Sequence, residues 1–155
     1  MSCMKMASVF VLMASFLGTH ADASCSKISG GKDYAFSYDG CVLEMEKADG
    51  PDFYLYNIKR KSNPSRTLLT MYLGGAPDVQ DFYDDKEKIV ERSIEEIKIE
   101  TRERRDADGG ASYEALIARP VNTEGRAEYF HVLSEKLTPE DLNLVKKIVF
   151  SIKAK

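Results

Sequence analysis

The segment FYLYNIKRKSNPSRTLLTMYL (residues 53–73) decides the expected fold. Apolar side chains occupy both odd and even positions of 53–58 and of 68–73, and the SNPS run (62–65) between them is typical of a turn. A strand that is apolar on both faces belongs in the middle of a sheet that is covered on both sides. The segment therefore predicts two neighbouring central strands.

Further strands are expected on either side of this segment. Residues 34–45 alternate around Asp39-Gly40, a dipeptide suited to a two-residue hairpin turn. In that hairpin Tyr38 would face Cys41, and Phe36 would face Leu43. Other alternating runs predict strands at 96–104, 112–120 and 126–136.

Two helices are expected. The first covers 77–92 and begins at Pro77-Asp78; the second begins at Thr138, an N-cap followed by Pro139, and carries an apolar stripe along one face. The whole prediction is an α+β fold in a single domain over residues 24–155. It has an antiparallel sheet of about seven strands, mostly in meander order, covered by helices on both faces.

The N-terminus has the three parts of a secretory signal peptide. Lys5 is followed by an uncharged apolar run over 7–17 and by an A-x-A motif that ends at Ala23. The run is shorter than the roughly 20 residues that a membrane-spanning helix needs. Asp22, three places before Cys25, argues against lipid attachment at that cysteine. We therefore expect cleavage of residues 1–23 and a periplasmic or secreted protein that is not inserted in a membrane.

Cys25 and Cys41 are the cysteines that remain after this cleavage. An even pair in an oxidising compartment predicts a disulfide. Zinc binding is disfavoured because C-x-x-C spacing is absent and His131 is the single histidine of the mature chain. A Cys–His nucleophile pair would need a free thiolate, which export disfavours. No metal or other cofactor is expected.

The C-terminal segment PEDLNLVKKIVFSIK (139–153) resembles the end of PsbP-like proteins. The matching positions are Glu140, Asp141, Lys147, Ile148, Ser151 and Ile152. The resemblance also extends to the order of expected strands and helices along the mature chain. It implies an antiparallel sheet between helices and an accessory or partner-binding role, and it implies no catalytic residue.

Motifs of common enzymes are absent: the sequence has no G-x-S-x-G, H-E-x-x-H or Walker A pattern. His131 lies in an expected strand, and no neighbouring residue is nominated as its catalytic partner. Asp106 and Asp108 begin like a calcium loop, but Ala111 and Ile117 stand where an EF-hand needs Gly and Glu. We therefore expect no catalytic residues and a turn at 106–110, and weak calcium binding by the two aspartates stays open.

The net charge of −3 argues against general binding of nucleic acid. Basic residues gather at 59–66 and 102–105, and acidic residues gather at 78–87. Opposite charges in separate segments help to steer a protein partner. The residues expected to contact that partner are Lys59, Arg60, Lys61, Asp81, Asp84 and Asp85.

These observations favour a small exported binding protein that is not an enzyme and that acts by protein–protein contact. The most concrete version is a periplasmic inhibitor or immunity protein against a cell-wall-degrading toxin. One alternative is an accessory protein of an envelope complex, as the PsbP-like resemblance implies. The other is a small secreted hydrolase that uses two carboxylates at a fixed separation.

Overall fold

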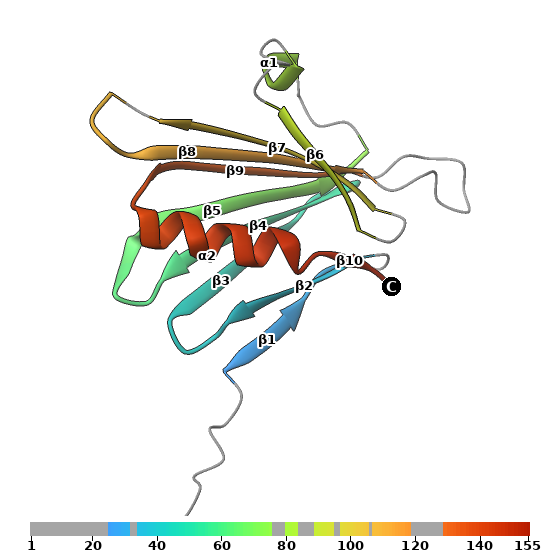
Figure 1. Ribbon diagram of the computed structural model, residues 1–155. Helices are drawn as coiled ribbons and strands as arrows, with labels where there is room; N and C mark the ends of the chain where they lie inside the picture. Colours follow the sequence, from blue (N-terminus) through green and yellow to red (C-terminus); the bar gives the residue numbers. More distant parts are fainter. Residues whose placement is uncertain are drawn as a thin grey trace, which may run out of the picture.

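The computed structural model describes residues 25–31, 34–75, 80–83, 89–94, 97–105, 107–118 and 129–155 (Figure 1). Their elements follow one another as β1 (Ser26–Ser29), β2 (Tyr34–Asp39), β3 (Leu43–Asp49), β4 (Phe53–Arg60), β5 (Asn63–Gly74), α1 (Gln80–Tyr83), β6 (Ile89–Ile94), β7 (Ile97–Arg105), β8 (Ala111–Ala118), β9 (Tyr129–Leu137), α2 (Pro139–Phe150) and β10 (Lys153–Ala154). The expected signal peptide, residues 1–23, lies outside the described residues.

The strands form two antiparallel sheets. The larger has the order β3-β4-β5-β9-β8-β7-β6, and the smaller has the order β1-β2-β10. The large sheet consists of two meanders, β3-β4-β5 and β6-β7-β8-β9, which are joined where β5 pairs with β9. Between the two meanders, the chain passes from β5 in the middle of the sheet to β6 at its edge. The predicted meander order therefore holds within each half of the sheet. The pairing of β5 with β9, which joins the halves, was not predicted.

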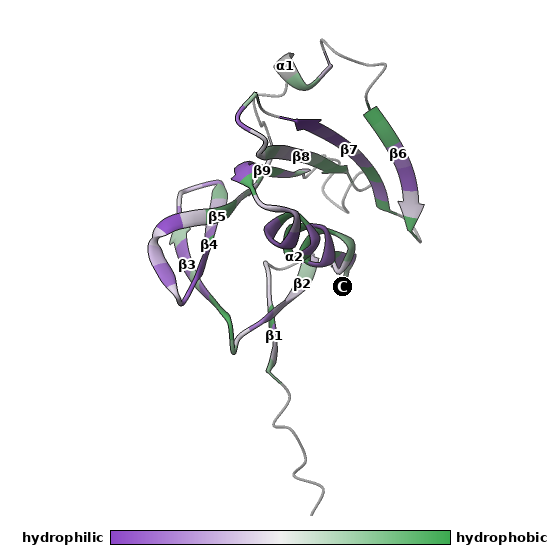
Figure 2. Cartoon of the chain, turned by 60° about the vertical axis from the view of Figure 1, so that its left-hand side comes forward, coloured by the Kyte–Doolittle hydropathy of each residue, from purple (hydrophilic) through white to green (hydrophobic). Residues whose placement is uncertain are grey.

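The core lies on one face of the large sheet, which we call the inner face. This face carries Tyr56, Met71 and Val132, all fully buried, and it packs against α2 and the small sheet. Figure 2 shows the large sheet bending around α2. The ring of Phe36 on β2 meets that of Tyr56 edge-to-face, with centroids 5.3 Å apart. We call the opposite face of the large sheet the outer face.

The α+β prediction, with helices covering both faces of the sheet, is wrong. The described residues are mostly β, and their one long helix, α2, covers only the inner face. Of the described residues in the segment expected to be a helix over 77–92, Gln80–Tyr83 is helical, whereas Ile89 and Val90 begin strand β6. Residues 77–79 and 84–88 lie outside the described residues. β-branched residues such as Ile89 and Val90 favour strands, and the backbone of β6 forms hydrogen bonds with β7 along its length.

The expected hairpin over 34–45 is also wrong. β2 pairs with β1 and β10, whereas β3 pairs with β4, so the Asp39-Gly40 turn carries the chain from one sheet to the other. The backbone N–H of Cys41 donates to the Asp39 carboxylate at 2.9 Å, which stabilises the turn locally. A turn is present at residues 40–42, but neither Asp39 nor Gly40 has the positive φ that a two-residue type I′ hairpin turn requires. A turn-forming dipeptide does not determine which neighbouring strand each arm will pair with.

The C-terminal helix prediction is confirmed. The Thr138 hydroxyl accepts a hydrogen bond from the Asp141 backbone N–H at 3.1 Å, and Pro139 occupies the first helical position. Val145 and Val149 are fully buried. The helix ends at Ser151, whose hydroxyl accepts a hydrogen bond from the Ser37 backbone N–H at 2.8 Å and so directs the chain into β10. Among the described residues, no helix is long and apolar enough to cross a membrane.

Candidate binding face on the outer side of the sheet

The predicted disulfide between Cys25 and Cys41 is present. β1 runs antiparallel to β2, and this pairing brings Cys25 beside the turn, where its carbonyl accepts a hydrogen bond from Gly40. The Asp39 carboxylate lies close to both sulfurs. Because the sulfurs are bonded to each other, they are not thiolate ligands for a metal ion.

The basic residues expected to contact a partner are engaged within the molecule. Lys59 forms an ion pair of 2.8 Å with Glu46, and the Lys61 ammonium donates to the Gly40 carbonyl at 2.6 Å. Arg60 reaches Asp141 at 2.6 Å. These contacts give the three cations structural roles, while their contact with a partner stays a prediction. Of the acidic residues, Asp84 and Asp85 lie outside the described residues, and the Asp81 side chain is not described.

The ion pair of Arg60 anchors the start of α2 on the β4–β5 hairpin. The Asp141 carboxylate is buried in the first turn of the helix and is also within 3.4 Å of Arg66. A second nitrogen of Arg66 donates to the Lys136 carbonyl. An acidic group in the first turn interacts favourably with the helix dipole. This basic segment therefore joins the sheet to the helix.

The structure describes one of the two aspartates that begin the possible calcium loop. Asp106 lies outside the described residues. The Asp108 carboxylate accepts a hydrogen bond from the Gly110 backbone N–H at 3.1 Å. This bond is typical of a turn, which is the structure expected for the segment.

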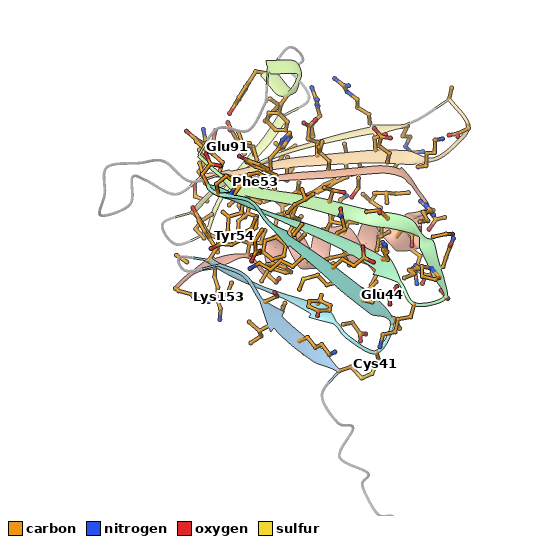
Figure 3. All side chains as sticks on the ribbon, turned by 180° about the vertical axis from the view of Figure 1, so that it is seen from behind. Cys41, Glu44, Phe53, Tyr54, Glu91 and Lys153 are labelled. Atoms are coloured by element: carbon orange, nitrogen blue, oxygen red, sulfur yellow. A yellow bond between two sulfur atoms is a disulfide. The ribbon has the colours of Figure 1, made fainter. Side chains whose placement is uncertain are left out.

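The outer face carries an apolar surface, which we call the outer patch: Phe53, Leu55, Tyr72 and Leu133. Leu55 pairs with Tyr72 across β4 and β5, and Leu133 follows on β9. The Leu133 side chain is 44% exposed, and the other three are partly buried. Figure 3 views the molecule from behind and labels Phe53 on this sheet. The patch thus crosses three strands of the rigid sheet.

The two rings of the outer patch are fixed by close packing. They lie 5.6 Å apart between centroids and within 22° of parallel. A Cβ at Gly74 would come within 2.5 Å of the Tyr72 hydroxyl, so the ring uses space that only glycine leaves open. Likewise, a Cβ at Gly50 would come within 2.2 Å of the Phe53 ring. The two glycines therefore let the aromatic rings lie close to the backbone.

Polar groups surround the patch. On the β3 side, Glu44 and Glu46 point to the same face, and Glu46 holds Lys59. Between the strands, the Thr70 hydroxyl bonds the Asn57 side-chain oxygen at 2.9 Å. An apolar centre with aromatic residues inside a polar rim is the usual composition of a protein–protein interface.

On its other side, the patch adjoins a buried polar network. His131 Nε2 lies 2.8 Å from one carboxylate oxygen of Glu114, and Arg102 forms an ion pair with the other. His131 is 7% exposed, and Arg102 is buried. The sequence alone did not nominate Glu114, because the contact depends on the register between β8 and β9. In that register His131 pairs with Leu116, and Glu114 lies two residues before Leu116 on the same face of β8.

The network fastens α1 to the outer face. Arg102 donates to the Phe82 carbonyl at 3.0 Å and lies 5.2 Å from the centroid of its ring. The Tyr83 hydroxyl donates to Glu100 at 2.8 Å. α1 therefore sits over β7 and covers a different part of the face from the outer patch.

The network keeps its carboxylate ionised. Burial alone would raise the pKa of Glu114, but hydrogen bonds from His131 and Arg102 outweigh this effect and hold the pKa below its ordinary value. Burial, reinforced by the bond to Glu100, raises the pKa of Tyr83 to about 12, so this hydroxyl remains a donor at neutral pH. The arrangement compensates buried charge and holds strands β7, β8 and β9 to α1.

Comparison with known proteins adds no relative, because no family model, curated protein or solved structure matches the chain. The resemblance to PsbP-like proteins thus stays a prediction. The described residues lack the second helical layer that this resemblance implied. The candidate site is accordingly defined by its own geometry, and its centre is the outer patch.

Proposed function

We propose that this chain is an exported binding protein that recognises another protein through the outer patch. The observation that carries the proposal is the set of large apolar side chains, Phe53, Leu55, Tyr72 and Leu133, on an open part of the outer face. Aromatic residues that are already rigid lose little conformational entropy on binding, and they commonly dominate interface energetics. An apolar patch within a polar rim is a frequent mark of such a surface.

Export is part of the proposal. The Cys25–Cys41 disulfide is compatible with a secreted protein, and disulfides persist mainly in oxidising compartments. The N-terminal sequence pattern supports the same location. We place the protein in the periplasm or outside the cell.

The specific function that we propose is stoichiometric inhibition, as a periplasmic inhibitor or immunity protein against a cell-wall-degrading enzyme. A sheet surface that carries two stacked aromatic side chains is suited to covering the rim of an active site. Lys59 and Glu46 border the patch and provide charges that can steer the encounter. The patch supplies the binding energy in this proposal, and the charged rim supplies orientation.

The test is site-specific photocrosslinking in envelope extract of the source organism. Benzoylphenylalanine replaces Leu133 in the mature protein, and a matched protein carries it at Ile28, which is 73% exposed on β1. We expect a discrete crosslinked partner from position 133 and not from position 28. Tyr72→Ala in the position-133 protein should reduce this product at least fivefold, since it removes one of the two aromatic anchors.

The captured partner then distinguishes the candidate roles. A partner that degrades peptidoglycan and loses activity when one equivalent of the mature protein is added supports the inhibitor role. A membrane complex whose activity is unchanged or increased would identify an accessory protein instead. Equal crosslinking from positions 133 and 28 would show that the outer patch is not the recognition surface.

A further inference from the structure

A second surface lies on the inner side of the large sheet, where α2 does not cover its edge. It is a groove of about 410 Å³ between the helix and strands β6 and β7, a size within the range of small-molecule sites. Its lining includes Val90, Arg92, Glu103, Tyr113, Lys146 and Phe150. Figure 2 shows α2 and the strands β6 and β7 that border it. The groove is on the opposite face from the outer patch and does not depend on it.

The groove has an excess of positive charge. The lining has two cations, Lys146 and Arg92. Lys146 forms an ion pair of 2.6 Å with Glu103, so the guanidinium of Arg92 supplies the excess charge. Arg92 lies 4.9 Å from the centre of the Phe150 ring, and within the described part of the chain no carboxylate is within ion-pair distance of it. An anion in the groove would therefore meet a guanidinium that is held by a ring and not neutralised by a neighbouring acid.

Tyr113 is a buried aromatic residue of the lining. Its side chain is 2% exposed, and Thr101, which also lines the groove, is close enough to hydrogen-bond its hydroxyl. Burial raises the pKa of Tyr113 to about 12, against the opposing effects of this hydrogen bond and of the Arg92 charge, so the hydroxyl keeps its proton at neutral pH. The hydroxyl oxygen is itself inaccessible, so Tyr113 shapes the groove and does not donate to a ligand.

The remaining surface is apolar. Val90 is 54% exposed and lies on the inner face of edge strand β6, while Phe150 closes the groove from the helix. Val90 and Phe150 offer contact to a hydrocarbon chain or a ring. The lining thus combines the Arg92 cation with apolar walls.

We propose that this groove binds a small amphiphilic carboxylate. The carboxylate accepts hydrogen bonds from Arg92, and its apolar body lies against Val90 and Phe150. Arginine suits this task because its planar guanidinium can bind both oxygens of a carboxylate.

The experiment is calorimetric titration of the mature protein with phenylbutanoate, together with NMR mapping of the perturbed amides. We expect saturable binding with shifts concentrated in 89–94, 101–103, 113 and 146–150. Phenylbutanamide, which has nearly the same shape but no charge, should bind at least tenfold more weakly. Arg92→Gln should lower the affinity for the carboxylate at least tenfold.

The controls separate a specific site from general effects. Arg92→Gln changes an exposed side chain of edge strand β6, so this variant should fold with undiminished thermal stability. Lys153→Gln removes an exposed cation on β10 and should leave the affinity unchanged. Absence of saturable binding, equal affinity for the amide, or equal loss in the Arg92→Gln and Lys153→Gln variants would overturn the proposal.

Discussion

Glu114 shows how a single residue joins distant parts of this fold. Its carboxylate receives His131 on one oxygen and Arg102 on the other, and Arg102 in turn holds the Phe82 carbonyl of α1. Removing one member of such a network leaves the others buried without compensation. The residue therefore matters for stability although it does not belong to the outer patch.

This network predicts a pH dependence of stability. Because the pKa of Glu114 is lowered in the folded state, its ionised form stabilises the fold above the ordinary glutamate pKa of about 4.3. That contribution is lost as the pH falls through the lower folded-state pKa. We expect Glu114→Gln to reduce the free energy of unfolding at pH 7 by about 1–3 kcal/mol and to flatten its decline below about pH 4.3.

Urea unfolding measured across a pH series tests this prediction. Glu135→Gln removes an exposed carboxylate on the neighbouring strand and is the matched control. The control should follow the wild-type profile. A Glu114→Gln profile that runs parallel to the wild type at all pH values would contradict the role assigned to the network.

At the scale of elements, α2 depends on its first turn. Thr138 caps the helix, and Asp141 connects the same turn to Arg60 of β4. These contacts hold the helix over the inner face, where Val145 and Val149 are fully buried. The cap is a local interaction, whereas the link to Arg60 requires the folded sheet.

The cap can be tested by substitution. Thr138→Ala removes the acceptor for the Asp141 backbone N–H and should lower the free energy of unfolding by about 1 kcal/mol. Thr138→Ser keeps the hydroxyl and should change stability by no more than a few tenths of a kcal/mol. Chemical denaturation of both variants provides the comparison, and equal losses in the two would show that the hydroxyl does not act as a cap.

At the scale of the whole molecule, the disulfide ties the small sheet to the turn that enters the large one. Cys25 precedes β1, and Cys41 precedes β3, so the bond closes the path over which the chain changes sheets. Its sequence separation of 16 residues restricts the unfolded chain appreciably. The bond thus stabilises the junction between the layers.

We expect the double substitution Cys25→Ala and Cys41→Ala to lower the free energy of unfolding by about 3 kcal/mol. The large sheet should retain its pairing in the variant, and hydrogen exchange should increase mainly in β1 and β2. Denaturant unfolding and exchange mass spectrometry measure both effects. Uniform acceleration of exchange across β4, β5 and β9 would show that the bond supports the whole fold and not only this junction.

The sequence by itself determined the features that depend on neighbouring residues. The strands over 53–73 and the cap at Thr138 are local patterns, and both are present in the structure. The cover that was expected over both faces of these strands is wrong, because α2 packs on the inner face alone. The disulfide also followed from the sequence, because a signal-peptide pattern and an even pair of remaining cysteines favour it.

Only the tertiary structure decided how these elements pair. Backbone hydrogen bonds are the same for any adjoining strand, so the alternation of residues 34–45 could not show that β2 and β3 belong to different sheets. The contact of His131 with Glu114 and the outer patch depend on registers between strands that are distant in sequence. The groove beside α2 depends on where the helix stops covering the sheet. Such non-local choices follow from packing and cannot be read from periodicity.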